Sequence, residues 1–113
     1  MKPGMTTVTV GYPSGADKTF DRKYYMDKHI PLIRERFGAA MKGLMVDYGL
    51  GGPVPGSEAT YMTIATMYFE SPDAFQNAFG PHADEILGDL KNFTNAEPMI
   101  QINEIAGMWH GGN

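Results

Sequence analysis

The chain has 113 residues, 42% of them hydrophobic, and a net charge of −4 at pH 7, which fits one domain spanning residues 1–113 and gives no positive field for nucleic-acid phosphates. It contains no cysteine, which excludes disulfides, thiolate metal sites and cysteine nucleophiles. No run approaches the roughly 20 apolar residues of a membrane span, and Met1–Val10 lacks the apolar centre of a signal peptide, so we expect a cytoplasmic protein with no membrane contact.

The first predicted element is a β-strand over Thr7–Tyr12. Val8, Val10 and Tyr12 alternate with smaller or polar residues and therefore share one face of the strand. The sequence Pro-Ser-Gly at positions 13–15 then predicts a turn that ends the strand.

An amphipathic helix is predicted next. Thr19 or Asp21 caps its start, and it ends at Phe37 with Gly38 as the C-terminal stop. Apolar residues spaced by four, three and four positions give the helix one packing face. That face consists of Met26, Ile30, Ile33 and Phe37.

A second line of residues on this helix carries chemical groups. Asp21, Tyr25 and His29 recur every four residues, which places them a quarter turn or more from the apolar face. Pro31 has no backbone N–H and its ring crowds the carbonyl of Asp27, so the helix is expected to kink or restart there. The free Asp27 carbonyl would then lie beside His29.

Two strands follow, over Met41–Leu50 and Thr60–Phe69, and the glycine- and proline-rich segment Gly49–Gly56 forms a loop between them. The second of these strands carries apolar side chains on both faces. We place Met62, Ile64 and Tyr68 on one face and Tyr61, Ala65, Met67 and Phe69 on the other. Because helices would cover only one face, a second subunit is expected to cover the other.

Two helical segments come after these strands. Ser71 supplies the cap and Pro72 the first position of a helix that breaks at residues 80–81, Gly-Pro. Apolar residues at helical spacing then predict a second segment over His82–Phe93.

The last predicted strand covers Pro98–Ala106. Its apolar alternation, set by Ile100 and Ile102, slips by one position at Ile105. Either Glu104 points toward the face that carries Ile100, or a β-bulge lies near residues 103–104. We favour the bulge.

The predicted order is strand, helix, strand, strand, helix, strand. This is the split βαβ pattern of an α+β, ferredoxin-like sandwich, a four-stranded antiparallel sheet with helices on one face. The uncovered face predicts a face-to-face homodimer that closes a dimeric α+β barrel, with an interface of roughly 2,000 Å² or more.

A set of residues in this chain resembles the EthD family, named after ethyl tert-butyl ether degradation. The set comprises Phe20, Asp21, Tyr24, Tyr25, His29, Pro31, Leu32, Asn92, Phe93, Thr94 and the strand Pro98–Ile105. The resemblance extends from about Thr7 to Ala106. It implies the ferredoxin-like domain of the dimeric α+β barrel superfamily, which includes cofactor-free monooxygenases, isomerases and haem-binding proteins, and a role in the catabolism of small organic molecules.

Histidine is the side chain best suited to proton transfer near neutral pH. We therefore predict a catalytic group of His29, Tyr25 and Asp21. Three further tyrosines are predicted to bind the substrate through their rings or hydroxyls: Tyr24, Tyr12 and Tyr68. The structural alternative is that His29 donates a hydrogen bond to the free Asp27 carbonyl and fixes the helix kink.

Two functions follow from these residues. The first is a cofactor-free isomerase, cyclase or monooxygenase acting on a small apolar compound, and the second is an accessory protein that binds such a compound for an oxygenase without turnover. We expect no metal and no cofactor, and ligation of haem by His29 or His82 is the weaker possibility. The Gly49–Gly56 loop could act as a lid in either case.

Overall fold

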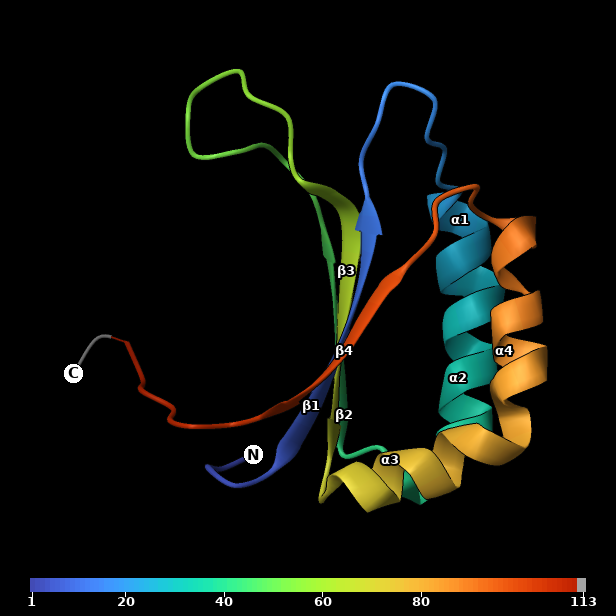
Figure 1. The fold of residues 1–113 in the computed structure, drawn as a ribbon, viewed down its shortest axis with the longest axis vertical. Coiled ribbons are helices and arrows are strands. Elements are labelled where there is room, and N and C mark those ends of the chain that lie inside the picture. The colour runs from blue at the N-terminus through green and yellow to red at the C-terminus, as the bar shows by residue number, and fades with distance from the viewer. Residues whose placement is uncertain (112–113) are drawn as a thin grey trace.

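Four antiparallel strands form one sheet in the computed structural model, which describes residues 1–111 (Figure 1). The strands are β1 (Thr6–Pro13), β2 (Gly43–Tyr48), β3 (Tyr61–Phe69) and β4 (Met99–Glu104). Their spatial order is β2-β3-β1-β4, so β1 pairs with both β3 and β4. This is the ferredoxin-like topology, and the predicted fold class is confirmed.

All the helices lie on one face of the sheet, and the opposite face is bare (Figure 1). The first helical segment runs through α1 (Arg22–Tyr24), the π-helical turn η1 (Tyr25–His29) and α2 (Ile30–Phe37), and the 3₁₀ turn η2 (Gly38–Ala40) follows it. The second consists of α3 (Pro72–Phe79), η3 (Gly80–His82), α4 (Ala83–Gly88) and η4 (Leu90–Asn92).

The ends of these helices follow the predicted signals. The Asp21 carboxylate accepts a hydrogen bond from the Tyr24 backbone N–H at 3.0 Å and so caps α1. Gly38 ends α2 with a φ of 53°, a conformation that favours glycine. The Ser71 hydroxyl accepts from the Ala74 N–H at 3.0 Å and caps α3.

The predicted kink or restart at Pro31 takes the form of a restart. A π-helical turn, in which the Ile30 N–H donates to the Tyr25 carbonyl, precedes Pro31, and regular α-helix resumes at Ile30 as α2. One extra residue in a turn rotates the side chains that precede it by about 100° around the helix axis. Tyr25 therefore takes the buried position that the regular spacing assigned to Met26, and Met26 is 44% exposed.

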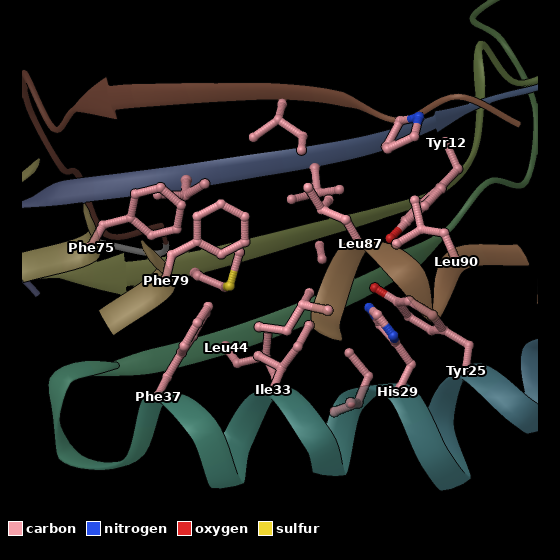
Figure 2. A pocket seen from close by; sticks show the side chains of 18 residues that line it. Tyr12, Tyr25, His29, Ile33, Phe37, Leu44, Phe75, Phe79, Leu87 and Leu90 are labelled. Carbon is pink, nitrogen blue, oxygen red and sulfur yellow. The ribbon is translucent and has the colours of Figure 1, made fainter. Parts of the chain in front are cut away.

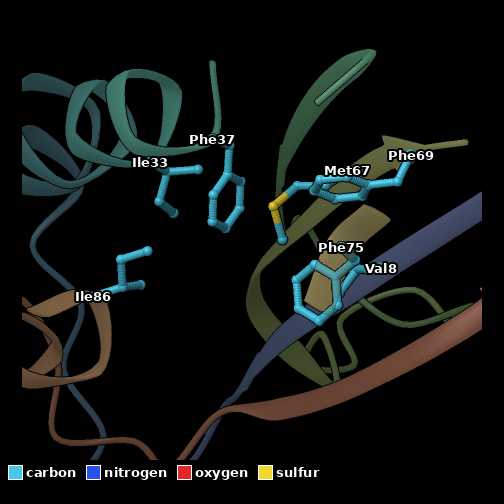
Figure 3. Packing of buried hydrophobic residues seen from close by; sticks show 7 residues of the cluster. All are labelled: Val8, Ile33, Phe37, Met67, Phe69, Phe75 and Ile86. Atoms are coloured by element: carbon cyan, nitrogen blue, oxygen red, sulfur yellow. The ribbon is translucent and has the colours of Figure 1, made fainter. Parts of the chain in front are cut away.

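The hydrophobic core lies between the sheet and the helices (Figure 3). Phe37 of α2, Phe75 of α3 and Phe69 of β3 meet edge to face, with ring centroids 5.3–6.3 Å apart. The buried residues of this cluster are Val8, Ile33, Phe37, Met67, Phe69, Phe75 and Ile86.

Two details of the sheet differ from the sequence prediction. The β1–β4 register is regular through Thr6 and Glu104, so the favoured bulge is wrong and Glu104 shares the face of Ile100. An irregularity lies instead between β1 and β3, next to Pro13. It turns Tyr61 onto the bare face, where its ring covers Gly11, while Met62 packs among the aromatic residues under the helices.

The loop between β2 and β3 projects beyond the sheet, away from the helices (Figure 1). Within it Leu50 is fully exposed. Across residues 1–111, no helix combines the length and the apolar character needed to cross a bilayer.

Candidate functional site

A cavity of about 50 Å³ lies between the sheet and the helices (Figure 2). No Asp, Glu, Lys or Arg lines it. Its polar groups gather at one end, here called the polar end, formed by Tyr12, Tyr25 and His29. The opposite end, the phenyl end, is formed by Phe37, Phe75 and Phe79. The two most exposed lining residues, Leu87 of α4 and Ile100 of β4, mark the mouth.

The π-helical turn places two functional side chains on the buried face of the helix. Tyr25 and His29 begin and end this turn, and each is only 1% exposed. Their rings stack with centroids 5.6 Å apart and an angle of 20° between the planes. The Phe93 ring also packs on the imidazole at 4.6 Å. His29 is therefore held by packing in one orientation.

An aspartate fixes the tautomer of His29. The imidazole Nδ1 lies 2.9 Å from Oδ2 of Asp89, the residue between α4 and η4. An ionised carboxylate only accepts hydrogen bonds, so Nδ1 carries the proton and donates it. The other ring nitrogen, Nε2, then carries no proton and can act as an acceptor on a side chain that lines the cavity.

Asp89 itself is held by two further donors. Its Oδ1 accepts from the Tyr24 hydroxyl at 2.6 Å and from the Asn92 amide at 2.9 Å. Burial raises the pKa of Asp89, but the hydrogen bonds from Tyr24, Asn92 and His29 outweigh it and hold the pKa below its ordinary value. Asp89 is ionised at neutral pH.

The environment of His29 favours its neutral form. Burial lowers the pKa of His29 below 6.5, and the hydrogen bond to Asp89 offsets this only in part. At neutral pH the imidazole therefore carries no charge, which is the state of a general base.

Both tyrosines of the polar end keep their protons. Burial raises the pKa of Tyr12 to about 12, and the neighbouring Tyr25 hydroxyl lowers it slightly. Burial likewise raises the pKa of Tyr25, and the Tyr12 hydroxyl beside it raises it further. Two protonated hydroxyls next to a neutral imidazole can donate hydrogen bonds to an oxygen on which negative charge develops.

The other predicted site residues lie elsewhere. Asp21 is exposed and caps the helix, with no contact to His29. Tyr24 lies outside the cavity and reaches the site only through its hydrogen bond to Asp89. Tyr68 lies on the bare face of the sheet, opposite the cavity. The Gly49–Gly56 loop contributes no lining residue.

Sequence reasoning missed Asp89. Within the predicted helical segment His82–Phe93 nothing distinguishes it from the exposed Asp84 and Glu85. It lies 60 positions from His29 in the chain, so local spacing carries no signal for the pair. The predicted hydrogen bond from His29 to the Asp27 carbonyl is wrong, because Asp89 occupies the donor instead.

The site does not fit a haem. A cavity of about 50 Å³ is far too small for a porphyrin. In the part of the chain that the structure describes, no three His, Asp or Glu residues come together as a metal site.

Comparison with known proteins gives the family and the fold of the chain. The family model of the EthD domain matches residues 13–97, which include Tyr24, Tyr25, His29 and Asp89. The chain belongs to the EthD family. A comparison with curated proteins gives no match. Family and fold together support a protein that binds or breaks down small molecules.

Solved EthD proteins share the fold along most of their length. An EthD-like protein from Ralstonia eutropha is 35% identical, with a TM-score of 0.86 over 91% of this chain and 93% of the other. An EthD family protein from Bacillus halodurans is 19% identical, with a TM-score of 0.67 over 88% and 97%. A hydroxynitrile lyase from Passiflora edulis is 18% identical, with a TM-score of 0.60 over 96% and 99%, and shows a likeness of fold.

Proposed function

We propose that this EthD protein catalyses cofactor-free proton transfer on a small, uncharged carbonyl compound. The proposal is carried by one observation, the buried His29–Asp89 pair at the polar end of an otherwise apolar cavity. An ion pair or dyad that served stability alone would not need a free imidazole nitrogen beside two protonated hydroxyls.

In the proposed step, His29 Nε2 removes a proton from the carbon next to the carbonyl. The electron pair of the broken C–H bond moves to the carbonyl oxygen, and an enolate and an imidazolium form. Asp89, ionised and 2.9 Å from Nδ1, stabilises the imidazolium. Return of the proton to the same or to a conjugated carbon gives exchange or isomerisation, with no redox change.

Tyr25 is assigned the role of hydrogen-bond donor to the enolate oxygen, with Tyr12 as its neighbour. Their raised pKa values mean that they stabilise the charge without losing their own protons. Tyr24 and Asn92 are assigned as positioning residues, because they contact Asp89 and not the cavity.

The test is deuterium exchange at the α-carbon of simple ketones in D₂O, followed by NMR. Replacing His29 by Gln is expected to lower the exchange rate about 10²- to 10⁴-fold, the usual contribution of a general base. His82→Gln is the matched control, because His82 lies in η3 and does not line the cavity. Equal rates for wild type and His29→Gln would refute the proton-transfer role.

The second candidate function is a metabolite carrier without turnover, supporting an oxygenase in the breakdown of ethers or related compounds. The small and mostly apolar cavity favours it, because such a lining shields an apolar ligand from water. Under this function ketones bind to the wild type without exchange, and His29→Gln changes only their affinity.

We also infer that the protein acts as a homodimer through the bare face of the sheet. This face carries Met45, 48% exposed, and Met99, 36% exposed, around the half-buried Ile64 and Tyr68. Proteins of the same fold from Bacteroides fragilis and Thermobifida fusca are described as dimeric. Ile64→Lys is expected to yield monomers in sedimentation, whereas Val54→Lys in the exposed loop is not.

A further inference from the structure

The cavity is asymmetric along its length. The polar end and the phenyl end lie at opposite ends of α2, because His29 and Phe37 are about 12 Å apart along the helix axis. Figure 2 shows the same order, with the labelled phenylalanines at one side and Tyr12, Tyr25 and His29 at the other. Because a volume of only about 50 Å³ reaches between these two ends, the cavity is narrow and admits only a thin, unbranched ligand.

The chemistry of the lining defines the polarity of that ligand. Every polar side chain in the lining belongs to the polar end, and no charged side chain is present to pair with an ionised ligand. Burying an unpaired charge in such a site would be strongly unfavourable. The ligand is therefore uncharged, with its hydrogen-bonding atom at one extremity.

The phenyl end closes the cavity with rings that support one another. Phe79 stacks on Phe75 with centroids 5.2 Å apart and 10° between the planes, and it meets Phe37 edge to face at 6.5 Å. This stack is a fixed wall on the side away from His29.

Midway between the two ends, the sheet presents a very small side chain. Ala65 of β3 lines the cavity and is 3% exposed. It lies between Met67, which belongs to the core cluster, and Thr63, which pairs with Tyr12. A larger residue at this position would divide the space between the polar and the phenyl ends.

We propose that the ligand is a thin, uncharged, unbranched carbonyl compound with a straight alkyl tail, whose length is selected by Phe79 and Ala65. The carbonyl lies at the polar end and the tail points to the phenyl end. This inference rests on the proposed function for the orientation of the carbonyl, but the selection of length is a property of binding alone.

The experiment measures the affinity of a series of straight-chain methyl ketones by calorimetry, on the full chain. Each added methylene is expected to tighten binding by up to about fourfold while the tail still finds apolar wall, since burying one CH₂ yields about 0.8 kcal/mol. Beyond a limiting length the affinity falls, because the tail meets Phe79.

Two variants shift that limiting length in opposite directions. Ala65→Val is expected to shorten it, and Phe79→Leu to lengthen it by one or more methylenes. Thr66→Val is the matched control, because Thr66 lies next to Ala65 on the bare face of the same strand and should leave the limit unchanged. Circular dichroism identifies any variant that fails to fold, and one folded variant suffices for the test.

The outcomes separate this inference from the proposed function. A limiting length that moves with either folded variant supports it, whether or not the ketones exchange deuterium. An affinity independent of tail length, no binding of any member of the series, or a limit unmoved in the folded variants would overturn it. Deuterium exchange without a limiting length would keep the proposed function and reject the selection of length.

Discussion

The phenyl end and the polar end of the cavity are built from the same helix and the same sheet, but from opposite kinds of residue. At the phenyl end, rings without polar atoms pack on a core that includes Phe69, which is fully buried. At the polar end, an imidazole and hydroxyls are buried, and Asp89 holds the imidazole in place. One end contributes packing alone, whereas the other also holds groups that can exchange protons and hydrogen bonds.

The boundary between the two ends is the π-helical turn. C-terminal to it, Ile33 and Phe37 follow the regular helix spacing and enter the core. Within it, the extra residue places Tyr25 and His29 on the buried face of the helix. π-Helical turns are often found at functional sites, and here the turn begins and ends on the two residues that line the polar end.

The largest effect on stability is expected from Phe69→Ala, which removes a core side chain next to the phenyl end. Removing a fully buried ring that meets Phe37 at 5.7 Å and Phe75 at 5.3 Å should cost about 3–5 kcal/mol of the free energy of unfolding. Urea denaturation measures the loss. Phe69→Leu serves as the milder variant if Phe69→Ala does not fold, and a loss below about 1 kcal/mol for the alanine variant would contradict this account.

Asp89→Asn is expected to act in the opposite way, with a moderate loss of stability and a larger loss of activity. Three donors lose their ionised acceptor, which should cost about 1–3 kcal/mol in urea denaturation. The rise in the activation free energy of deuterium exchange should be larger than this loss of stability, because the asparagine no longer stabilises the imidazolium. Asp84→Asn on α4 is the control, and equal exchange rates for Asp89→Asn and wild type would argue against positioning by Asp89.

The polar end should make stability depend on pH. The pKa of His29 is lower in the folded than in the unfolded state, so the unfolded chain binds more protons as the pH falls below about 6.5. The stability supplied by neutral His29 is thus complete above this pH and is lost progressively below it. Between pH 8 and pH 5 the melting temperature of the wild type should therefore fall more than that of His29→Gln, whose melting temperature depends less on pH.

Pro31→Ala is expected to have the smallest effect on stability, within about 1 kcal/mol, while changing the site. The alanine restores an N–H and removes the ring, so the turn is free to relax toward regular α-helix. NMR of the His29 imidazole should then report a weakened hydrogen bond to Asp89 and a changed pKa. Pro72→Ala at the start of α3 is the matched control, and an imidazole signal identical to that of the wild type would show that Pro31 does not maintain the turn.

Much of the fold could be predicted because its signals are local. The strand alternation around Val8, the cap at Asp21 and the stop at Gly38 depend on residues within a few positions of one another. The errors arose where one inserted residue moves the neighbouring side chains to another face of a helix or strand. The turn at Tyr25–His29 moved Met26 off the buried face of the helix. The irregularity beside Pro13 put Tyr61 on the bare face of the sheet and Met62 on the face under the helices.

Only part of the candidate site could be predicted from the sequence. His29 and Tyr25 were identified because they share a helix, and Tyr12 because it shares the inward face of its strand with Val8. The structure places Tyr68 on the face away from the cavity, and the sequence could not show this, because a strand with apolar residues on both faces does not reveal which face meets the helices. Tyr24 was assigned to the substrate, whereas its hydroxyl contacts Asp89.

By itself the sequence determined the elements, their order, the antiparallel sheet and the residue types available for chemistry, because these follow from hydrophobic period, caps and turns. Only the tertiary structure decided that Asp89 partners His29, that the imidazole stays neutral, and that the cavity has one polar and one phenyl end. The physical reason is that hydrogen bonds and burial act over a few ångströms in space. Folding brings into that range groups that lie 60 positions apart in the chain.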